Sequence, residues 1–313
     1  MSSPPVKRQR TEDVSITRST VWYRDGSVIL QATNIQFRVH WGVLSQHSSF
    51  FRALEDFPQP SDQPTIDGSP IVELPDSAAD IEHLLTALYD PTFLSQTTLA
   101  LAVVGALIRL GRKYDFKNLL DSAVARLTSH NPATLAEYDA LNVKSGSMRI
   151  MTYPGYSLDL LTLAQENNIG LVLPLAYYRT LRCSTPTEWV KQSHFCHWRI
   201  SVDASMAAKK LATKQFQPGY TLGWLREWPY PPADCDSPKK CNATRKHVFY
   251  SFLDANRLKP FLEASQIEIW KGFLCVACYQ HVFESVTAGR QKMWEELPAI
   301  FDLPPWHEVK NDL

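Results

Sequence analysis

The chain has 313 residues, which is enough for about two domains. Its hydrophobic content of 44% and charged content of 20% are ordinary for a soluble globular protein, so we expect a sizeable core. The formal net charge is zero, which argues against a protein whose whole surface binds nucleic acid or anionic membrane. The longest apolar run, residues 99–108, is too short to cross a bilayer.

The first 18 residues contain prolines and basic residues but few apolar ones, which predicts a disordered arm. No signal-peptide pattern is visible, so we expect an intracellular protein with reduced cysteines. The run Lys7-Arg8-Gln9-Arg10 resembles a short basic nuclear import signal, and a solvated tail is the alternative. The expected location is the nucleus if this signal acts, and otherwise the cytoplasm.

A hairpin that leads directly into short helices is predicted for residues 25–51. Asp25-Gly26 is a turn signal, and apolar residues then alternate with others along 28–32. The next tight turn contains Asn34, which tolerates a left-handed backbone. The alternation resumes along 35–39 before the period becomes helical. Trp22 and Tyr23 precede this hairpin and are expected to cover a sheet edge.

The next segment, residues 55–70, is predicted to be a loop because its prolines remove backbone donors and restrain φ. The apolar spacing then predicts a short strand at 71–74 and helices over 81–89, 103–114 and 116–127. Ser77 is a suitable N-cap for the first of these helices, with Asp80 in its first turn.

Taken with this order of elements, a set of short motifs resembles the BTB/POZ domain family. The residues that carry the resemblance are Asp25, Val28, Phe37-Arg38-Val39-His40, Val43-Leu44-Ser45, Ser48-x-Phe50-Phe51 and Lys113-Tyr114. The sequence is especially similar to fungal BTB-domain proteins of uncharacterised role. The resemblance implies an α+β fold, in which an N-terminal BTB/POZ domain has a short mixed sheet capped by helical hairpins. A mainly α-helical C-terminal region follows.

The resemblance also implies interaction residues, namely Asp25, Phe37, His40 and Trp41. Many dimerising relatives carry a basic residue directly after the Phe-x-x-His histidine, where it pairs with the early aspartate. Trp41 stands at that place here, so we expect Asp25 to lack this partner and self-association to be weak. The proline-rich loop also differs from the hydrophobic-x-Glu element that the family uses to bind cullins.

The predicted domain organisation has four parts: an arm at 1–18, a BTB/POZ domain at 19–130, a helical extension at 131–182 and a helical domain at 183–313. Pro174 is expected in the first turn of the last helix of the extension. The final part is rich in cysteine and tryptophan. It holds all six cysteines and seven of the nine tryptophans, so we expect a second, aromatic-rich core there.

Two cysteine pairs in the last part have the spacing of metal ligands. They are Cys235-x5-Cys241 and Cys275-x2-Cys278. Four thiolates form a closed tetrahedral zinc site with no open position, so we predict one structural zinc rather than a catalytic metal. The alternative is that these cysteines are small buried hydrophobic residues.

The remaining chemistry-bearing residues give weaker signals. His194-Phe195-Cys196-His197 could bind a metal or hold a Cys/His nucleophile, but a buried polar cluster is favoured because the other parts of such sites are missing. Cys183 stays unassigned. The basic residues Lys239-Lys240 and Arg245-Lys246 are interpreted as a solvated face rather than a nucleic-acid site.

The sequence contains none of the common nucleotide-binding, hydrolase or metalloprotease motifs. We therefore predict a non-enzymatic protein–protein interaction module whose partners are other proteins, not a membrane or nucleic acid. An adaptor of a cullin-type ubiquitin ligase is the second hypothesis, a nuclear transcriptional regulator the third, and a catalytic role the last.

Overall fold

The protein is represented by a computed structural model that describes residues 15–55, 64–143, 149–183, 198–227, 229–254 and 258–313. It divides into two compact units, Met1–Val124 and Ala125–Leu313. The division falls inside one helix, α5 (Lys117–His130). Among the described residues, no helix is long and apolar enough to cross a membrane.

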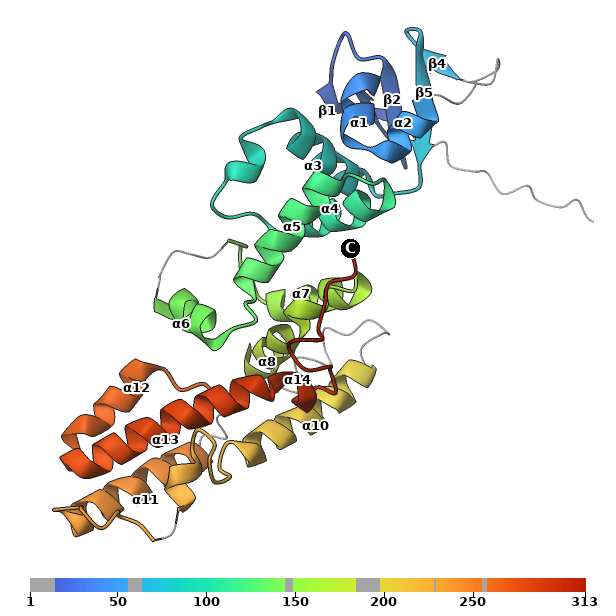
Figure 1. Ribbon diagram of the computed structural model, residues 1–313. Helices are drawn as coiled ribbons and strands as arrows, with labels where there is room; N and C mark the ends of the chain where they lie inside the picture. The colour runs from blue at the N-terminus through green and yellow to red at the C-terminus, as the bar shows by residue number, and fades with distance from the viewer. Residues whose placement is uncertain (1–14, 56–63, 144–148, 184–197, 228, 255–257) are drawn as a thin grey trace, which may run out of the picture. The chain divides into compact units, whose positions relative to one another are not determined.

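A five-stranded sheet forms one side of the first unit (Figure 1). Its strands are β1 (Thr17–Trp22), β2 (Val28–Ala32), β3 (Ile35–Val39), β4 (Thr65–Ile66) and β5 (Ser69–Leu74), in the order β1-β3-β2-β5-β4. Strand β2 pairs antiparallel with β3 and parallel with β5. The sheet is therefore mixed, as predicted.

The central strand β2 differs from the predicted alternation because it is buried on both faces. Val28, Ile29 and Leu30 are all at most 1% exposed. The turn that follows also differs from the prediction. Thr33, rather than Asn34, has the left-handed backbone, with φ of 55°. A positive φ at the first central residue is one of the patterns that hairpin turns adopt.

Strand β1 was not predicted, and it changes the interpretation of the N-terminal residues. It begins at Thr17, before the predicted end of the arm, and pairs parallel with β3. Trp22 is thus part of the edge strand instead of a cover for the edge, and the Arg18 guanidinium lies 4.6 Å from its ring centroid. At the opposite edge, β4 and β5 form a short hairpin, so β5 begins two residues before the predicted Ile71.

In the described part of the first unit, four helices and the beginning of a fifth, α5, lie beside the sheet. They are α1 (Trp41–His47), α2 (Ser49–Glu55), α3 (Ala78–Tyr89), α4 (Leu101–Lys113) and α5, with a 3₁₀ turn η1 (Phe93–Ser95). Helix α3 packs against α4, β1 and β2. Ser77 caps α3 as predicted, because its hydroxyl accepts the Asp80 N–H at 3.1 Å. Phe37, Phe51 and Phe116 are fully or almost fully buried in this unit.

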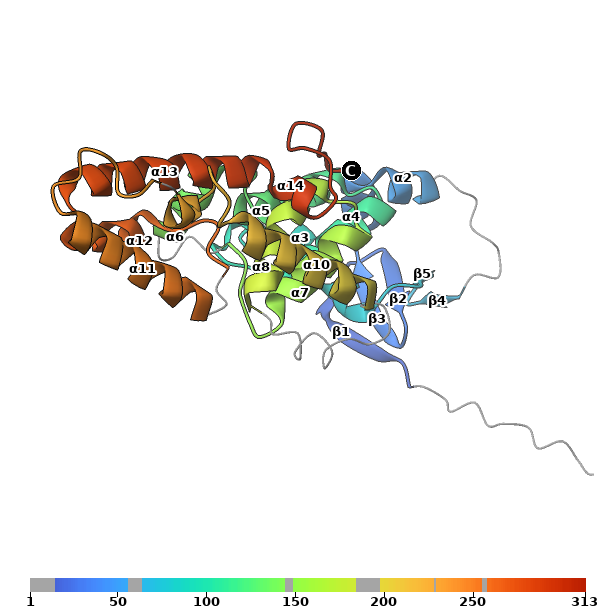
Figure 2. The ribbon, with the colours of Figure 1, turned by 90° about the horizontal axis from the view of Figure 1, so that it is seen from below.

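The second unit is helical, as predicted (Figure 2). Its helices are α6 (Leu135–Val143), α7 (Tyr156–Glu166), α8 (Leu173–Cys183), α10 (Trp198–Lys214), α11 (Pro238–Asp254), α12 (Ala264–Glu268), α13 (Val276–Glu295) and α14 (Leu297–Ile300). The 3₁₀ turns η2 (Gly170–Val172), η3 (Gly223–Arg226) and η4 (Ile269–Gly272) join some of them. Pro174 lies in the first turn of α8, which confirms that prediction.

Two clusters of buried side chains form the core of the second unit, and both are rich in aromatic residues. The first contains Tyr138, Tyr178 and Leu211, so residues of the predicted helical extension and of the predicted C-terminal domain share it. Its Trp294 indole donates to the Ala133 carbonyl at 2.8 Å. The second cluster surrounds two of the cysteines that were predicted to bind metal.

Helix α13 approaches the segment before η3 unusually closely. A Cβ atom added to Gly289 would lie 2.3 Å from the Tyr220 carbonyl carbon and 2.4 Å from the Thr221 nitrogen. Real Cβ atoms are essentially never found so near to backbone. Gly289 is therefore the residue that lets the two backbones meet.

Candidate functional site

The four cysteines of the predicted metal site converge. Each of Cys235, Cys241, Cys275 and Cys278 offers a sulfur atom, and these atoms all lie within 4.8 Å of one another. The sulfur atoms of Cys235 and Cys275 are 3.7 Å apart. Zn–S bonds of about 2.3 Å in a tetrahedron place sulfur atoms roughly 3.8 Å apart, so a small contraction would complete the coordination. This cluster is compatible with a zinc site.

The beginnings of two long helices bring the cysteines together. Cys235 precedes α11 and Cys241 lies in its second turn, while Pro238 occupies the first helical position, where a missing N–H costs nothing. Cys275 is the N-cap of α13, and its sulfur accepts the Cys278 N–H at 3.4 Å. Helix N-termini carry partial positive charge, which favours the thiolate form of Cys275 at the N-cap of α13.

Links between the two pairs fix their mutual position. The Cys275 N–H donates to the Cys241 sulfur at 3.3 Å. One turn further along α11, the Thr244 hydroxyl donates to the Phe273 carbonyl at 3.1 Å. These contacts hold the start of α13 against α11, as both views of the second unit show (Figures 1 and 2). The two cysteine pairs are far apart in sequence, and the fold brings them together.

The electrostatics of the cluster favour protons on the inner thiols when no metal is bound. Cys241 and Cys278 are completely buried, and burial raises the pKa of both thiols. At Cys275, burial also opposes the thiolate, but hydrogen bonds from the Cys278 N–H and the neighbouring thiols outweigh it and lower the pKa. A zinc ion would displace these protons, because thiolates are its ligands.

Three residues beside the cysteines were not predicted to belong to the site. Tyr230 and Trp224 lie in the same buried cluster as Cys241 and Cys278. Arg245 was interpreted as part of a solvated basic face, which is wrong, because its guanidinium stacks 4.4 Å from the Tyr230 ring centroid and donates to the Glu227 carbonyl. Lys239, Lys240 and Lys246 are exposed, as that interpretation requires.

The other predicted metal or nucleophile residues contribute nothing to this cluster that can be described. The segment His194 to His197, including Cys196, lies outside the described residues, as does Lys7-Arg8-Gln9-Arg10. Cys183 is the last residue of α8.

In the first unit, two of the predicted interaction residues contact each other. The His40 ring nitrogen Nε2 lies 3.3 Å from an Asp25 carboxylate oxygen, whose side chain is 84% exposed. Nδ1 of His40 lies 3.2 Å from the Tyr89 hydroxyl, which also accepts the His40 backbone N–H at 2.8 Å. Tyr23 stacks on Tyr89 with ring centroids 4.6 Å apart. Asp25 thus has a partner, but it is His40 and not the next residue.

The other two predicted interaction residues lie differently. Phe37 is fully buried, so its side chain supports the core of the unit. Trp41 is half-buried, and its ring packs nearly perpendicular to that of Phe51, with the ring centroids 6.3 Å apart. Its backbone N–H donates to the Ser27 hydroxyl at 2.9 Å. Only part of the Trp41 ring is available to a partner.

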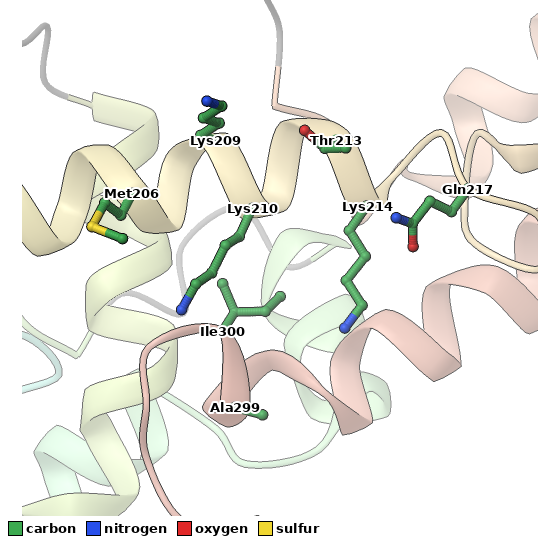
Figure 3. A pocket seen from close by; sticks show the side chains of 8 residues that line it. All are labelled: Met206, Lys209, Lys210, Thr213, Lys214, Gln217, Ala299 and Ile300. Atoms are coloured by element: carbon green, nitrogen blue, oxygen red, sulfur yellow. The ribbon is translucent and has the colours of Figure 1, made fainter.

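A hollow of about 640 Å³ lies between α10 and α14 in the second unit (Figure 3). Lys210 and Lys214 extend toward α14, whereas Lys209 points away from it (Figure 3). Lys210 pairs with Asp302 at 3.2 Å and Lys214 with Glu296 at 2.5 Å. Because carboxylates neutralise both of these lysines, the hollow does not define a site for an anionic ligand.

The short mixed sheet and the helices stacked beside it place the N-terminal unit in the α+β class. Within this class, residues 25–131 match the BTB/POZ domain family, so a BTB/POZ domain occupies this part of the chain. BTB/POZ domains are protein–protein interaction domains and mediate oligomerisation. Among curated proteins, none matches the chain.

Proposed function

We propose that this chain is a non-enzymatic interaction protein, in which the BTB/POZ domain binds other proteins and a structural zinc ion stabilises the C-terminal unit. The observation that carries the first part is the match of residues 25–131 to the BTB/POZ family of interaction domains. The motifs that carry the family resemblance are especially similar to those of fungal BTB-domain proteins, and we place the chain among them.

Affinity purification of the full chain with identification of bound proteins tests this function. The matched control is the chain with Phe37→Ala, which removes a buried ring and should disrupt the interaction domain. A set of partners lost in the control supports the proposal. A cullin among them assigns the chain to ligase adaptors, and chromatin proteins assign it to transcriptional regulators. A chain that captures no partner beyond those of the control would contradict an interaction role.

We further propose that self-association through the BTB/POZ domain is weak. Asp25 faces His40, and the half-buried Trp41 offers no charge at the position after it. Sedimentation velocity over a range of concentrations measures the association. A tight dimer that Asp25→Ala abolishes would refute this proposal, and a dimer insensitive to that change would show that another surface is used.

The proposed location is inside the cell, where a reducing environment keeps thiols available for metal. Nuclear import would depend on the basic run at Lys7, Arg8 and Arg10. Microscopy of the fluorescently tagged chain, and of a tagged variant with these three residues changed to alanine, tests whether the run directs nuclear import. Equal distribution of the two proteins would rule out this run as an import signal.

The zinc proposal rests on the convergence of four sulfur atoms within 4.8 Å. Metal analysis of protein purified under reducing conditions should give close to one zinc per chain. Cobalt(II) substitution should produce the intense thiolate-to-metal absorption of a tetrathiolate site. A chain that retains no zinc and takes up no cobalt would leave these cysteines as ordinary core residues.

A further inference from the structure

The Tyr230 hydroxyl is a buried polar group without a partner. The residue is 7% exposed and belongs to the buried cluster that contains Cys241 and Cys278. In the described part of the chain, its hydroxyl oxygen has no hydrogen-bond partner. Buried hydroxyl groups almost always have one, so the position of this group requires an explanation.

The neighbouring sulfur atom is that of Cys278. Burial is the main reason that the pKa of Tyr230 is raised, and the nearby Cys278 sulfur is the next. A neutral thiol is a weak acceptor, whereas a thiolate accepts a strong, charge-assisted hydrogen bond. A metal-bound Cys278 is a thiolate, and it would therefore be a good acceptor for this hydroxyl.

The Cys278 sulfur also lacks the backbone donor that two of the other three sulfurs have. The Cys241 sulfur accepts the Cys275 N–H at 3.3 Å, and the Cys275 sulfur accepts the Cys278 N–H at 3.4 Å. No backbone N–H within the described ranges donates to the sulfur of Cys278. A donor from a side chain would complete the hydrogen bonding of the inner thiolate.

The Tyr230 ring is held in place from one side by a cation. The Arg245 guanidinium lies 4.4 Å from its centroid and is fixed by bonds to the Glu227 carbonyl at 2.8 Å and to Asn242 at 3.2 Å. A zinc ion with four thiolates carries a net charge of about −2, from one divalent cation and four anionic sulfurs. Arg245 brings positive charge close to that anionic centre.

We infer that Tyr230 is a positioning residue of the metal site, whose hydroxyl donates a hydrogen bond to the metal-bound Cys278 thiolate. The inference rests on the proposed zinc site. It explains why a hydroxyl without a partner is buried in the cluster that contains Cys278. Partners that surround metal ligands typically change metal affinity by roughly 10- to 100-fold when they are removed.

The test uses the full chain, stripped of metal with a chelator under reducing conditions and titrated with cobalt(II) and then zinc. Tyr230→Phe removes only the hydroxyl and keeps the ring against Arg245. Tyr156→Phe is the matched control, because the Tyr156 hydroxyl is also buried without a partner in the described part of the chain but lies in α7. Circular dichroism of the metal-loaded proteins verifies that all of them are folded.

Tyr230→Phe should weaken metal binding about 10-fold or more and shift the thiolate-to-cobalt absorption band. It should also speed the alkylation of the metal-bound protein by iodoacetamide, because a hydrogen bond makes a thiolate less nucleophilic. Tyr156→Phe should match the wild type in all three measurements. Equal affinity and an equal band in Tyr230→Phe would overturn the role of Tyr230 but leave the zinc site standing. A wild-type chain that binds neither metal would overturn both.

Discussion

Phe37 is a residue whose role the sequence predicted through its position in an alternating strand, and its ring is fully buried. Phe37→Ala should lower the free energy of unfolding of the BTB/POZ unit by about 3–5 kcal/mol, since the ring leaves a cavity. Urea denaturation measures the loss. Phe50→Ala is the control, because the Phe50 side chain is 43% exposed and should cost much less. A loss below about 1 kcal/mol for Phe37→Ala would show that its ring does not support the core.

Asp25 should make the stability of the BTB/POZ unit depend on pH in the acid range. Hydrogen bonds from its own backbone N–H and from His40 lower the pKa of Asp25 below its ordinary value of 3.8. Because the folded-state pKa is the lower one, the stabilisation is present above the unfolded-state pKa and is lost as pH falls through the folded-state pKa.

Asp25→Asn should therefore be less stable than the wild type near neutral pH, and the difference should close as pH falls below about 4. Urea denaturation at a series of pH values measures both proteins. Asp121→Asn, a change at an exposed aspartate of α5, is the control. A difference that persists unchanged at the lowest pH would show that the carboxylate charge is not responsible.

The four cysteines that converge could be predicted at the level of residues because cysteine spacing is a local signal. Tyr230 could not, because nothing around it in sequence indicates that it will join the buried cluster that contains Cys278. The partner of Asp25 could not be predicted either. His40 was part of the motif, but only the pairing of β2 with β3 brings its ring next to the Asp25 carboxylate.

Among the elements, the helices with one apolar face were predicted well, and so was the hairpin of β2 and β3. Strand β1 was missed because Thr17–Trp22 has few apolar residues and its pairing with β3 is not local. The double burial of β2 was missed because its position in the middle of the sheet depends on β5, which comes much later in the chain.

Gly289 permits a prediction for α13. Alanine normally stabilises a helix by about 1 kcal/mol relative to glycine. Gly289→Ala should instead destabilise the C-terminal unit by roughly 1–3 kcal/mol, because its methyl group would press on the backbone of Tyr220 and Thr221. Gly272→Ala is the control, since a Cβ there meets nothing within 4 Å. Thermal unfolding of both variants measures the change in stability. A Gly289→Ala variant that is more stable than the wild type would contradict the close approach of α13 to the backbone of Tyr220 and Thr221.

For the whole molecule, metal removal should act on one unit. All four cysteines belong to the unit Ala125–Leu313. Metal-binding free energy contributes to folding only where the ligands are gathered. A chelator should therefore unfold the C-terminal unit around the cysteines and leave the BTB/POZ unit folded.

Hydrogen exchange, which reports on each segment separately, measures this asymmetry. Cys275→Ser should reproduce the effect of the chelator, and Cys183→Ser and Cys196→Ser should not. Equal loss of protection in β2 and in α13 would contradict the assignment of the metal to one unit.

The distance of 3.7 Å between the sulfur atoms of Cys235 and Cys275 also bears on oxidation. Once the metal is gone, a peroxide could oxidise one of these thiols to a sulfenic acid, and the other could displace water to form a disulfide. That bond would remove two of the four ligands at once and keep zinc from returning until a reductant opened it. The folding of the C-terminal unit would then respond to oxidative stress as well as to the supply of zinc.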